Sequence, residues 1–190
     1  MKNLIEKAGR VKLLVLDVDG VLSDGKIIYD ANGVETKAFS VKDGLGIKAL
    51  KKYGIKTAII TGRSSPMVDK RAQEMGVAYV IQGRDDKLTA LQELLAQLQG
   101  QGESVTPQDC AYMGDDLPDL KAIQTVGFAA TVANAHSEVI NRVDMVTTNA
   151  GGYGAVREVC DLILKGHGHY DDFLSNYLLA QTNSNQAAQS

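Results

Sequence analysis

Val11-Lys-Leu-Leu-Val-Leu-Asp-Val-Asp-Gly-Val-Leu-Ser-Asp24 is the stretch of sequence that decides the fold. It begins with a mostly apolar run over 11–18 and leads through Asp17 and Asp19 into Gly20. A short continuous apolar run that ends in acidic residues and glycine is typical of a strand buried on both faces of a parallel sheet. We therefore predict a first strand here, with both aspartates at its carboxyl end.

A hairpin is predicted directly after this strand. The segments 26–29 and 34–39 read as short extended pieces, and Asn32-Gly33 between them is a strong turn signal. The sequence therefore predicts a small β-hairpin flap over 25–39.

Predicted strands and helices alternate along the rest of the chain. Apolar runs predict further strands over 55–60, 77–81, 109–113, 128–132 and 145–148. Apolar residues at helical spacing predict helices over 43–53, 66–75, 88–98, 119–125, 136–142 and 155–164. This alternation favours an α/β fold with a doubly wound, mostly parallel Rossmann-like sheet. Because the sheet uses nearly all of the chain up to 165, we expect no separate cap domain beside the hairpin flap.

Composition excludes several classes of protein. The 190 residues hold 20 Lys and Arg against 23 Asp and Glu, so there is no basic excess to favour a nucleic-acid partner. A chain of this length can bury one core, and no apolar run approaches the about 20 residues of a membrane span. The segment 1–10 lacks the pattern of a secretory signal, so a cytoplasmic location is expected. Since Cys110 and Cys160 lack the spacing of a zinc site or a disulfide framework, we expect the chemistry to rest on carboxylates.

Polar residues follow four of the predicted strands. In an open α/β sheet, ligands bind at the carboxyl ends of the strands. Carboxylates gathered there repel one another unless a cation joins them, and hard oxygen ligands favour Mg²⁺. A metal ion and a lysine would stabilise phosphoryl transfer to one carboxylate, while a second carboxylate protonates the leaving oxygen and then activates water. The residues in question are Asp17, Asp19, Thr61-Gly62-Arg63, Lys87 and Gly114-Asp115-Asp116.

Each motif taken alone has a simpler interpretation. The aspartates after the first strand could cap a turn, and Thr61-Gly62-Arg63 could be a strand-to-helix turn. Lys87 alone reads as a solvated lysine in a first helical turn, and Gly114-Asp115-Asp116 as a turn with a helix cap. A calcium-binding EF-hand loop is excluded because the glycine stands at its fourth position. The ordered set of four, each at a strand end, favours a functional site.

This ordered set resembles the haloacid dehalogenase superfamily of phosphohydrolases. Longer stretches are similar to the family of 3-deoxy-D-manno-octulosonate 8-phosphate phosphatases, and the resemblance covers roughly residues 10–165. They are Asp17-Val-Asp-Gly-Val-Leu-Ser-Asp, the hairpin with its Asn32-Gly33 turn, Val41-Lys-Asp-Gly-Leu-Gly-Ile, Thr61-Gly-Arg and Gly151-Gly-Tyr-Gly-Ala-Val-Arg-Glu-Val.

The resemblance implies a magnesium-dependent phosphoric monoester hydrolase that frees the sugar acid and phosphate through an aspartyl phosphate, in the synthesis of lipopolysaccharide precursors. It implies that Asp17 is the nucleophile, that Asp19 is the acid and base, and that Thr61 and Lys87 bind the phosphoryl oxygens. It also implies that Mg²⁺ is held by Asp17, the backbone carbonyl of Asp19, and Asp115, with Asp116 behind these ligands.

The resemblance further implies a substrate-binding set. Lys48 stands where relatives carry arginine, and a lysine cannot reproduce a bidentate guanidinium contact. For Lys48 and Arg71 a solvated helix face is the alternative. The implied set is Asp19, Ser40, Val41, Lys42, Asp43, Gly44, Lys48, Thr61, Gly62, Arg63, Arg71 and Lys87.

The family resemblance also implies a homotetramer in which the hairpins close the active sites of neighbouring chains. It predicts one phosphatase domain over 1–165 and a C-terminal tail over 166–190. An apolar stripe over 170–179 needs a surface to dock on, whereas 182–190 holds no large apolar residue and is expected to be disordered.

Three other functions are alternatives. A related phosphatase could act on another sugar-acid phosphate, such as a nine-carbon acid 9-phosphate. A phosphate-accepting signalling receiver would carry its aspartate after the third strand, where this chain has Gln82-Gly83. A catalytically silent oligomerisation module need not keep Asp17, Asp19 and Lys87 together. The sugar-acid phosphatase is the preferred hypothesis.

Overall fold

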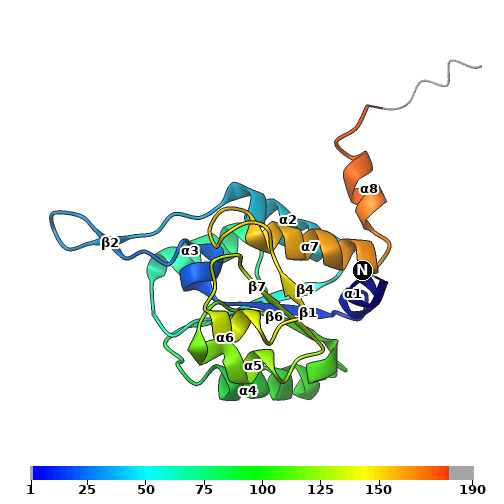
Figure 1. The fold of residues 1–190 in the computed structure, drawn as a ribbon, viewed down its shortest axis with the longest axis horizontal. Helices are drawn as coiled ribbons and strands as arrows, with labels where there is room; N and C mark the ends of the chain where they lie inside the picture. Colours follow the sequence, from blue (N-terminus) through cyan, green and yellow to red (C-terminus); the bar gives the residue numbers. More distant parts are fainter. Residues whose placement is uncertain (1, 180–190) are drawn as a thin grey trace, which may run out of the picture.

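A six-stranded parallel sheet forms the centre of the computed structural model, which describes residues 2–179 (Figure 1). The strand order is β5-β4-β1-β6-β7-β8, so the strand that carries the decisive stretch lies inside the sheet. The strands are β1 (Leu13–Leu16), β4 (Lys56–Ile60), β5 (Tyr79–Ile81), β6 (Cys110–Met113), β7 (Phe128–Thr131) and β8 (Met145–Val146). The predicted doubly wound α/β fold is confirmed.

Successive residues of β1 pack into two separate cores, one on each face of the sheet. Leu14 and Leu16 belong to the first core, whereas Leu13 and Val15 belong to the second. This alternation follows from the pleat of a strand, which points neighbouring side chains to opposite faces. A strand buried on both faces must therefore be apolar throughout, as this one is.

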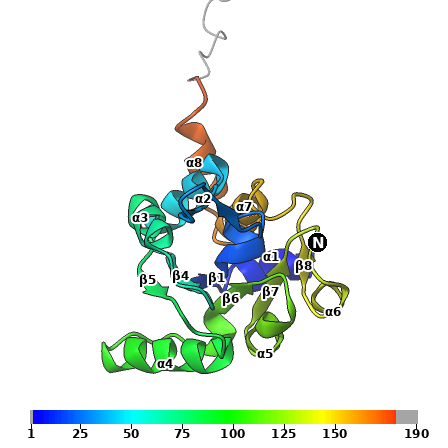
Figure 2. The same ribbon diagram turned by 90° about the vertical axis from the view of Figure 1, so that its left-hand side faces the viewer.

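Helices cover both faces of the sheet (Figure 2). Those of the first face are α1 (Lys2–Ala8), α2 (Val41–Lys52), α3 (Pro66–Met75) and α7 (Ala155–Gly166). Those of the second face are α4 (Lys87–Gly100), α5 (Leu120–Ile123) and α6 (Ser137–Ile140), with the short turns η2 (Pro107–Asp109) and η3 (Leu117–Asp119) nearby. The last helix, α8 (Tyr170–Ser175), buries Phe173 against the first core.

The predicted hairpin flap leaves the body of the molecule between β1 and α2 (Figure 1). Its strands β2 (Ile28–Tyr29) and β3 (Glu35–Thr36) pair antiparallel and are shorter than predicted. Most apolar side chains of the flap are exposed, and its two strands pair over two residues each. These exposed side chains are Ile27, Ile28, Tyr29 and Val34.

An irregular turn, η1 (Val18–Leu22), connects β1 to the hairpin and depends on two glycines. Gly20 has a φ of 94°, and a Cβ there would lie 2.0 Å from an Asp115 oxygen. A Cβ on Gly151, which precedes α7, would lie 1.7 Å from the carbonyl oxygen of Gly20. The Gly152 N–H also donates to the Val21 carbonyl at 2.9 Å. The glycine-rich loop before α7 therefore supports η1 from behind.

Several element boundaries differ from the sequence predictions. The helix predicted over 43–53 begins at Val41, because the Ser40 side chain accepts the Lys42 N–H and caps it. The helix predicted over 119–125 is shortened to α5, and its first predicted residue, Asp119, ends η3. Helix α1 was not predicted; it packs against α7, a contact between opposite ends of the chain. The part of the tail predicted to be disordered, 182–190, lies outside the described residues.

Within residues 2–179, no helix combines the length and the apolar character that crossing a membrane requires.

Candidate active site

Asp17 lies at the carboxyl end of β1, where backbone hydrogen bonds and an ion pair fix its position. Its backbone N–H donates to the Met113 carbonyl of β6 at 3.0 Å. Its Oδ1 accepts the Val18 N–H at 2.7 Å, and its Oδ2 lies 2.8 Å from Lys87 Nζ. The carboxylate is therefore fixed on one side by backbone and on the other by an ammonium group.

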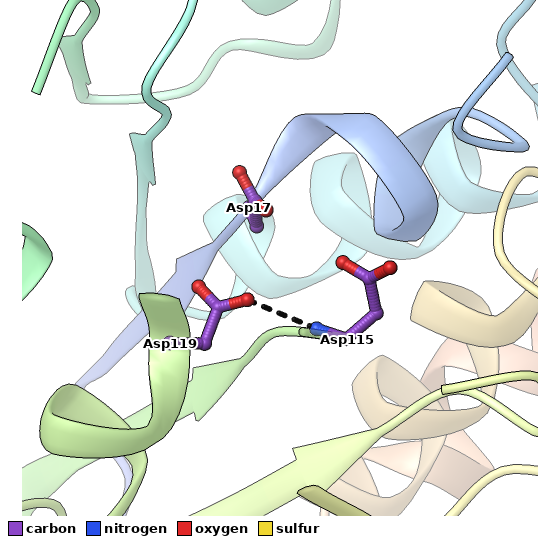
Figure 3. A group of neighbouring side chains, drawn as sticks. All are labelled: Asp17, Asp115 and Asp119. Atoms are coloured by element: carbon purple, nitrogen blue, oxygen red, sulfur yellow. Dashed lines mark hydrogen bonds between the residues drawn. The ribbon is translucent and has the colours of Figure 1, made fainter. Parts of the chain in front are cut away.

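Two further carboxylates gather beside Asp17 (Figure 3). Asp115 follows β6, and Asp119 ends η3. Each of the three offers an oxygen within 4.8 Å of the others. Asp119 is fully buried; its Oδ1 accepts from Lys87 Nζ at 2.6 Å and from the Tyr112 hydroxyl at 3.0 Å. Its Oδ2 accepts the Asp115 N–H at 3.1 Å, which orients the loop after β6.

The crowding of these carboxylates raises their pKa values. Burial, followed by the charge of Asp119, raises the pKa of Asp17 to about 6 against the pull of Lys87. Burial, followed by the charges of Asp17 and Asp119, raises the pKa of Asp115 to about 7. Burial lowers the pKa of Lys87, but the two aspartates outweigh burial and hold it above its ordinary value. The cluster is thus short of positive charge.

The donor set fits a magnesium ion. Asp17 and Asp115 supply carboxylate oxygens that are costly to ionise without a cation, and such hard oxygens are the ligands that Mg²⁺ prefers. The oxygens of Asp119 are already engaged by Lys87, Tyr112 and backbone N–H groups. Asp119 therefore fits a role in orienting Lys87 better than a role as a metal ligand.

Thr61 and Lys87 lie at the same edge of the sheet as Asp17. The register pairs Leu16 with Ile59, so Thr61, directly after β4, lies beside the end of β1. Its N–H donates to the Ile81 carbonyl at 3.0 Å, which ties it to β5. Lys87 is only 5% exposed, so its interpretation as a solvated lysine is wrong. Its two carboxylate partners account for its burial.

Asp19 has different neighbours from Asp17. Its Oδ1 contacts Lys37 Nζ, and its Oδ2 lies 3.7 Å from Arg63 Nε. Glu35 joins this group: its Oε1 lies 2.9 Å from Lys37 Nζ, and its Oε2 accepts from Arg63 at 2.8 Å. Lys37 and Glu35 belong to the hairpin. The second aspartate of the motif is therefore held by the flap and by the loop after β4.

The predicted substrate-binding stretch 40–44 forms the first turn of α2. Arg71 of α3 donates to the Ser40 carbonyl at 3.0 Å and fastens this turn to α3. A Cβ on Gly44 would lie 2.5 Å from the Arg71 guanidinium, so a side chain there would displace this guanidinium from the Ser40 carbonyl. Val41 is 80% exposed and Lys42 is also exposed, so both are accessible to a ligand.

Asp43 has a structural contact that the sequence did not indicate. Its side chain is buried, and its Oδ1 accepts the Arg157 N–H at 2.8 Å. Helix α7 has Gly154 at its N-cap, which offers no side chain, so Asp43 caps α7 from α2. Burial raises the pKa of Asp43 to about 6 despite these hydrogen bonds. Its contact with substrate stays a prediction.

Lys48 and Gly62 complete the set. Lys48 lies on the exposed side of α2 in a groove with Phe173 and Tyr177, and among residues 2–179 no ion pair or hydrogen bond joins it to the aspartates. Gly62 follows Thr61, and a Cβ there would lie 2.5 Å from Asp85 Oδ1. Gly62 thus lies at the edge of the aspartate cluster, whereas Lys48 lies away from it, beside α8.

Asp119 was missed by the sequence predictions, and Asp116 was named in its place. Asp116 is exposed and accepts the Leu117 N–H at 2.8 Å, so it caps η3. Asp119, which was not among the predicted site residues, contacts Lys87 at 2.6 Å. The spacing Asp116-x-x-Asp119, typical of a capping box, was the available signal.

One cavity formed by the described residues lies away from the aspartates. It has a volume of about 610 Å³ and sits where β1 and β6 begin, at the edge opposite Asp17. Lys7, Arg10, Lys12, Asp109 and His167 contribute to its lining. Its position separates it from the chemistry described above.

Comparisons with known proteins agree with the geometry. The sequence profile of the haloacid dehalogenase-like hydrolase family matches residues 40–127. The 3-deoxy-D-manno-octulosonate 8-phosphate phosphatase KdsC of Escherichia coli strain K12 is 46% identical over 170 residues, which are 90% of this chain and 88% of the relative. That of Yersinia pestis is 47% identical over 162 residues, or 85% of this chain and 84% of the relative.

Solved structures give the same result. The phosphatase from Moraxella catarrhalis, whose crystal contains a magnesium ion, a phosphate ion and a KDO molecule, matches with a TM-score of 0.89 and 52% identity over 94% of this chain and 99% of that one. The cobalt-bound deoxy-D-mannose-octulosonate 8-phosphate phosphatase from Haemophilus influenzae matches with a TM-score of 0.83 and 40% identity, covering 91% and 99%. The chain belongs to the 3-deoxy-D-manno-octulosonate 8-phosphate phosphatase family of haloacid dehalogenase-like hydrolases, which are phosphoric monoester hydrolases.

Proposed function

We propose that this chain hydrolyses 3-deoxy-D-manno-octulosonate 8-phosphate to the free sugar acid and inorganic phosphate, with Mg²⁺ as its cofactor. The observation that carries the proposal is the cluster of Asp17, Lys87 and Asp115 at the end of β1. It occurs in a chain that is 46% identical to a phosphatase named for that substrate. The reaction would supply lipopolysaccharide synthesis, as the family resemblance implies.

Asp17 is the proposed nucleophile. Its carboxylate oxygen forms a bond to phosphorus while the bond from phosphorus to the sugar oxygen breaks, which leaves an aspartyl phosphate. Lys87, 2.8 Å from Asp17, would offer its remaining donor capacity to a phosphoryl oxygen. Thr61, beside the end of β1, would donate its hydroxyl to another. Asp119 keeps Lys87 in place.

Asp19 is the proposed acid and base. In the first step its carboxylic acid gives a proton to the leaving sugar oxygen, which would otherwise depart as a poor alkoxide leaving group. In the second step the resulting carboxylate takes a proton from water, the water oxygen bonds to phosphorus, and Asp17 is released. Inorganic phosphate leaves, and Asp19 is protonated again for the next turnover.

Asp17, Asp115 and the backbone carbonyl of Asp19 are the proposed ligands of Mg²⁺. When bound, this ion neutralises phosphoryl oxygens and reduces their repulsion of the attacking carboxylate. Gly20 allows Asp115 to approach η1 closely, since any side chain at that position would meet its carboxylate. The chain therefore reserves space for the two acidic ligands.

The sugar acid is proposed to contact the rim around this cluster. Ser40, Val41, Lys42, Asp43 and Gly44 supply the first turn of α2, and Gly62 and Arg63 supply the loop after β4. Arg71 would add a positive charge, because it lies behind the Ser40 carbonyl. Lys48 would take part only through a ligand or a neighbouring chain that reaches the groove beside α8.

The proposal includes a domain organisation and an assembly. Residues 1–165 would form one phosphatase domain and 166–190 a tail. The exposed apolar flap supports a homotetramer in which hairpins close neighbouring active sites, because a lone two-stranded hairpin is marginal in water. Sedimentation should then show a tetramer that Ile28→Ser weakens. A cytoplasmic location is consistent with the two buried free thiols, Cys110 and Cys160.

The experiment that tests the function measures phosphate release from a panel of phosphorylated sugars and sugar acids, with Mg²⁺ and with excess chelator. The expected result is the highest kcat/KM on the eight-carbon sugar-acid 8-phosphate and no turnover in chelator. A higher kcat/KM on a nine-carbon sugar-acid 9-phosphate would replace the proposed substrate. Undiminished turnover in chelator would contradict the magnesium requirement.

A further inference from the structure

Lys37 is a buried lysine that no sequence motif singles out. It lies just after β3, where the hairpin returns to the body of the molecule, and its side chain is only 1% exposed. Lysine is almost never buried unless it is paired. Here the Nζ contacts Asp19 Oδ1 and lies 2.9 Å from Glu35 Oε1.

The charges around Lys37 balance within the chain. Lys37 and Arg63 carry two positive charges, which Glu35 and the ionised form of Asp19 balance. Lys37 is therefore paired with carboxylates of its own chain and does not need an anionic group of the substrate as a partner. This distinguishes it from the cluster at Asp17, where three carboxylates face one lysine.

Without Lys37, the Asp19 side chain would be loosely held. The Asp19 carboxylate is 22% exposed, its distance to Arg63 Nε is 3.7 Å, and the Ser23 hydroxyl reaches it only at 3.4 Å. A group that transfers a proton must stay within hydrogen-bond reach of the reacting oxygen, and a displacement of about 1 Å can reduce the rate by about 100-fold. Lys37 makes the closest of these contacts.

We propose that Lys37 is a positioning residue that holds the Asp19 carboxyl toward the leaving oxygen, and that Glu35, itself paired with Arg63, keeps Lys37 in place. This inference rests on the proposed function, because it assigns Lys37 a part in the step that Asp19 performs. It also gives the hairpin a task inside the active site of its own chain. The flap therefore contributes to proton transfer as well as to enclosure.

The test compares two esters that differ in their need for a proton. An alkyl phosphate such as the sugar-acid phosphate requires protonation of its leaving oxygen, whereas the phenolate of p-nitrophenyl phosphate leaves without it. For Lys37→Met, which keeps the length of the side chain and removes its charge, kcat/KM should fall about 100-fold on the alkyl ester and less than about fivefold on the aryl ester. Asp19→Asn should show the same selective loss.

A double variant then asks whether Lys37 acts through Asp19. In the Asp19→Asn background, Lys37→Met should change kcat/KM on the alkyl ester by less than about threefold, since the group that it positions is already absent. Independent, multiplying losses would overturn the proposal. Equal losses on both esters in the single Lys37→Met variant would also overturn it, as would a rise in KM for the sugar acid at constant kcat.

Glu35→Gln supplies a second variant in case Lys37→Met does not fold. It leaves the contact between Lys37 and Asp19 and removes only a supporting charge, so the ratio of alkyl to aryl kcat/KM should fall about threefold. An unchanged ratio in folded Glu35→Gln would overturn the proposal. Wild-type protein that hydrolyses neither ester with Mg²⁺ would instead contradict the proposed function, so the two failures are distinguishable.

Discussion

Asp17 and Asp19 are two residues apart in sequence, yet their surroundings differ in almost every respect. Asp17 is buried and held by Lys87 of α4, which Asp119 supports from η3. Asp19 is partly exposed and held by Lys37 of the hairpin and, at longer range, by Arg63. The surroundings of Asp17 come from elements that pack on the sheet, whereas those of Asp19 come mainly from the hairpin flap.

This difference matches the tasks proposed for the two carboxylates. A nucleophile must attack phosphorus in line with the leaving oxygen, so its carboxylate should be held rigidly. An acid and base must serve the leaving oxygen and later a water molecule, so it needs access to solvent. The contrast predicts that changes near Asp17 lower stability more than changes near Asp19, and that rate losses near Asp19 depend on whether the leaving oxygen needs a proton.

The largest effect is expected for Asp17→Asn. The amide keeps the shape of the carboxylate but is a far weaker nucleophile, so kcat should fall by at least about 10⁴-fold. The fold should persist because Lys87 keeps Asp119 as a partner. Phosphate release gives the rate, and circular dichroism checks the fold. Turnover close to that of the wild type would refute the role of Asp17.

Asp119→Asn is expected to have the next largest effect. Lys87 would lose one of its two buried partners, so kcat should fall about 100-fold and stability by about 2 kcal/mol. Urea unfolding and phosphate release measure the two quantities. Asp116→Asn is the matched comparison: asparagine also caps helices, so a loss below about threefold is expected. Equal losses in both variants would contradict the assignment of Asp119 over Asp116.

The sequence predicted the part of the site that follows directly from strand ends. Asp17, Thr61 and Asp115 could be placed because parallel strands bring their carboxyl ends to one edge. Asp119 and Lys37 could not be placed this way. Their partners are 32 and 18 residues away in sequence, and only the folded chain brings them together. Helix α1 was missed for the same reason, since its stability depends on α7.

Magnesium should stabilise the Asp17 environment in a pH-dependent way. The raised pKa values of Asp17 and Asp115, about 6 and about 7, mean that the metal-free folded state binds more protons than the unfolded chain above pH 3.8. By this contribution, the free energy of unfolding decreases as pH rises through that window to about 7. Mg²⁺ needs the ionised carboxylates, so its stabilisation should grow with pH.

The measurement is urea unfolding with Mg²⁺ or chelator at about pH 5.5 and about pH 8. At the higher pH, Mg²⁺ at 100 times its Kd should add about 2.7 kcal/mol, and clearly less at the lower pH. Sodium chloride at matched ionic strength is the control, because it screens charge without occupying the site. An equal gain at both pH values would show that Asp17 and Asp115 are not the ligands.

Ser23→Ala should have the smallest effect and tests what holds Asp19. The Ser23 hydroxyl lies 3.4 Å from Asp19 Oδ1 and 3.3 Å from the Val18 carbonyl, both near the limit of a hydrogen bond. Its removal should cost about 1 kcal/mol of stability and change kcat/KM by less than about threefold. If Ser23→Ala instead lowered kcat/KM tenfold on alkyl esters alone, the hydroxyl would share the orienting role of Lys37. Asp19 would then be fixed by η1 as well as by the flap, and the contrast with Asp17 would narrow.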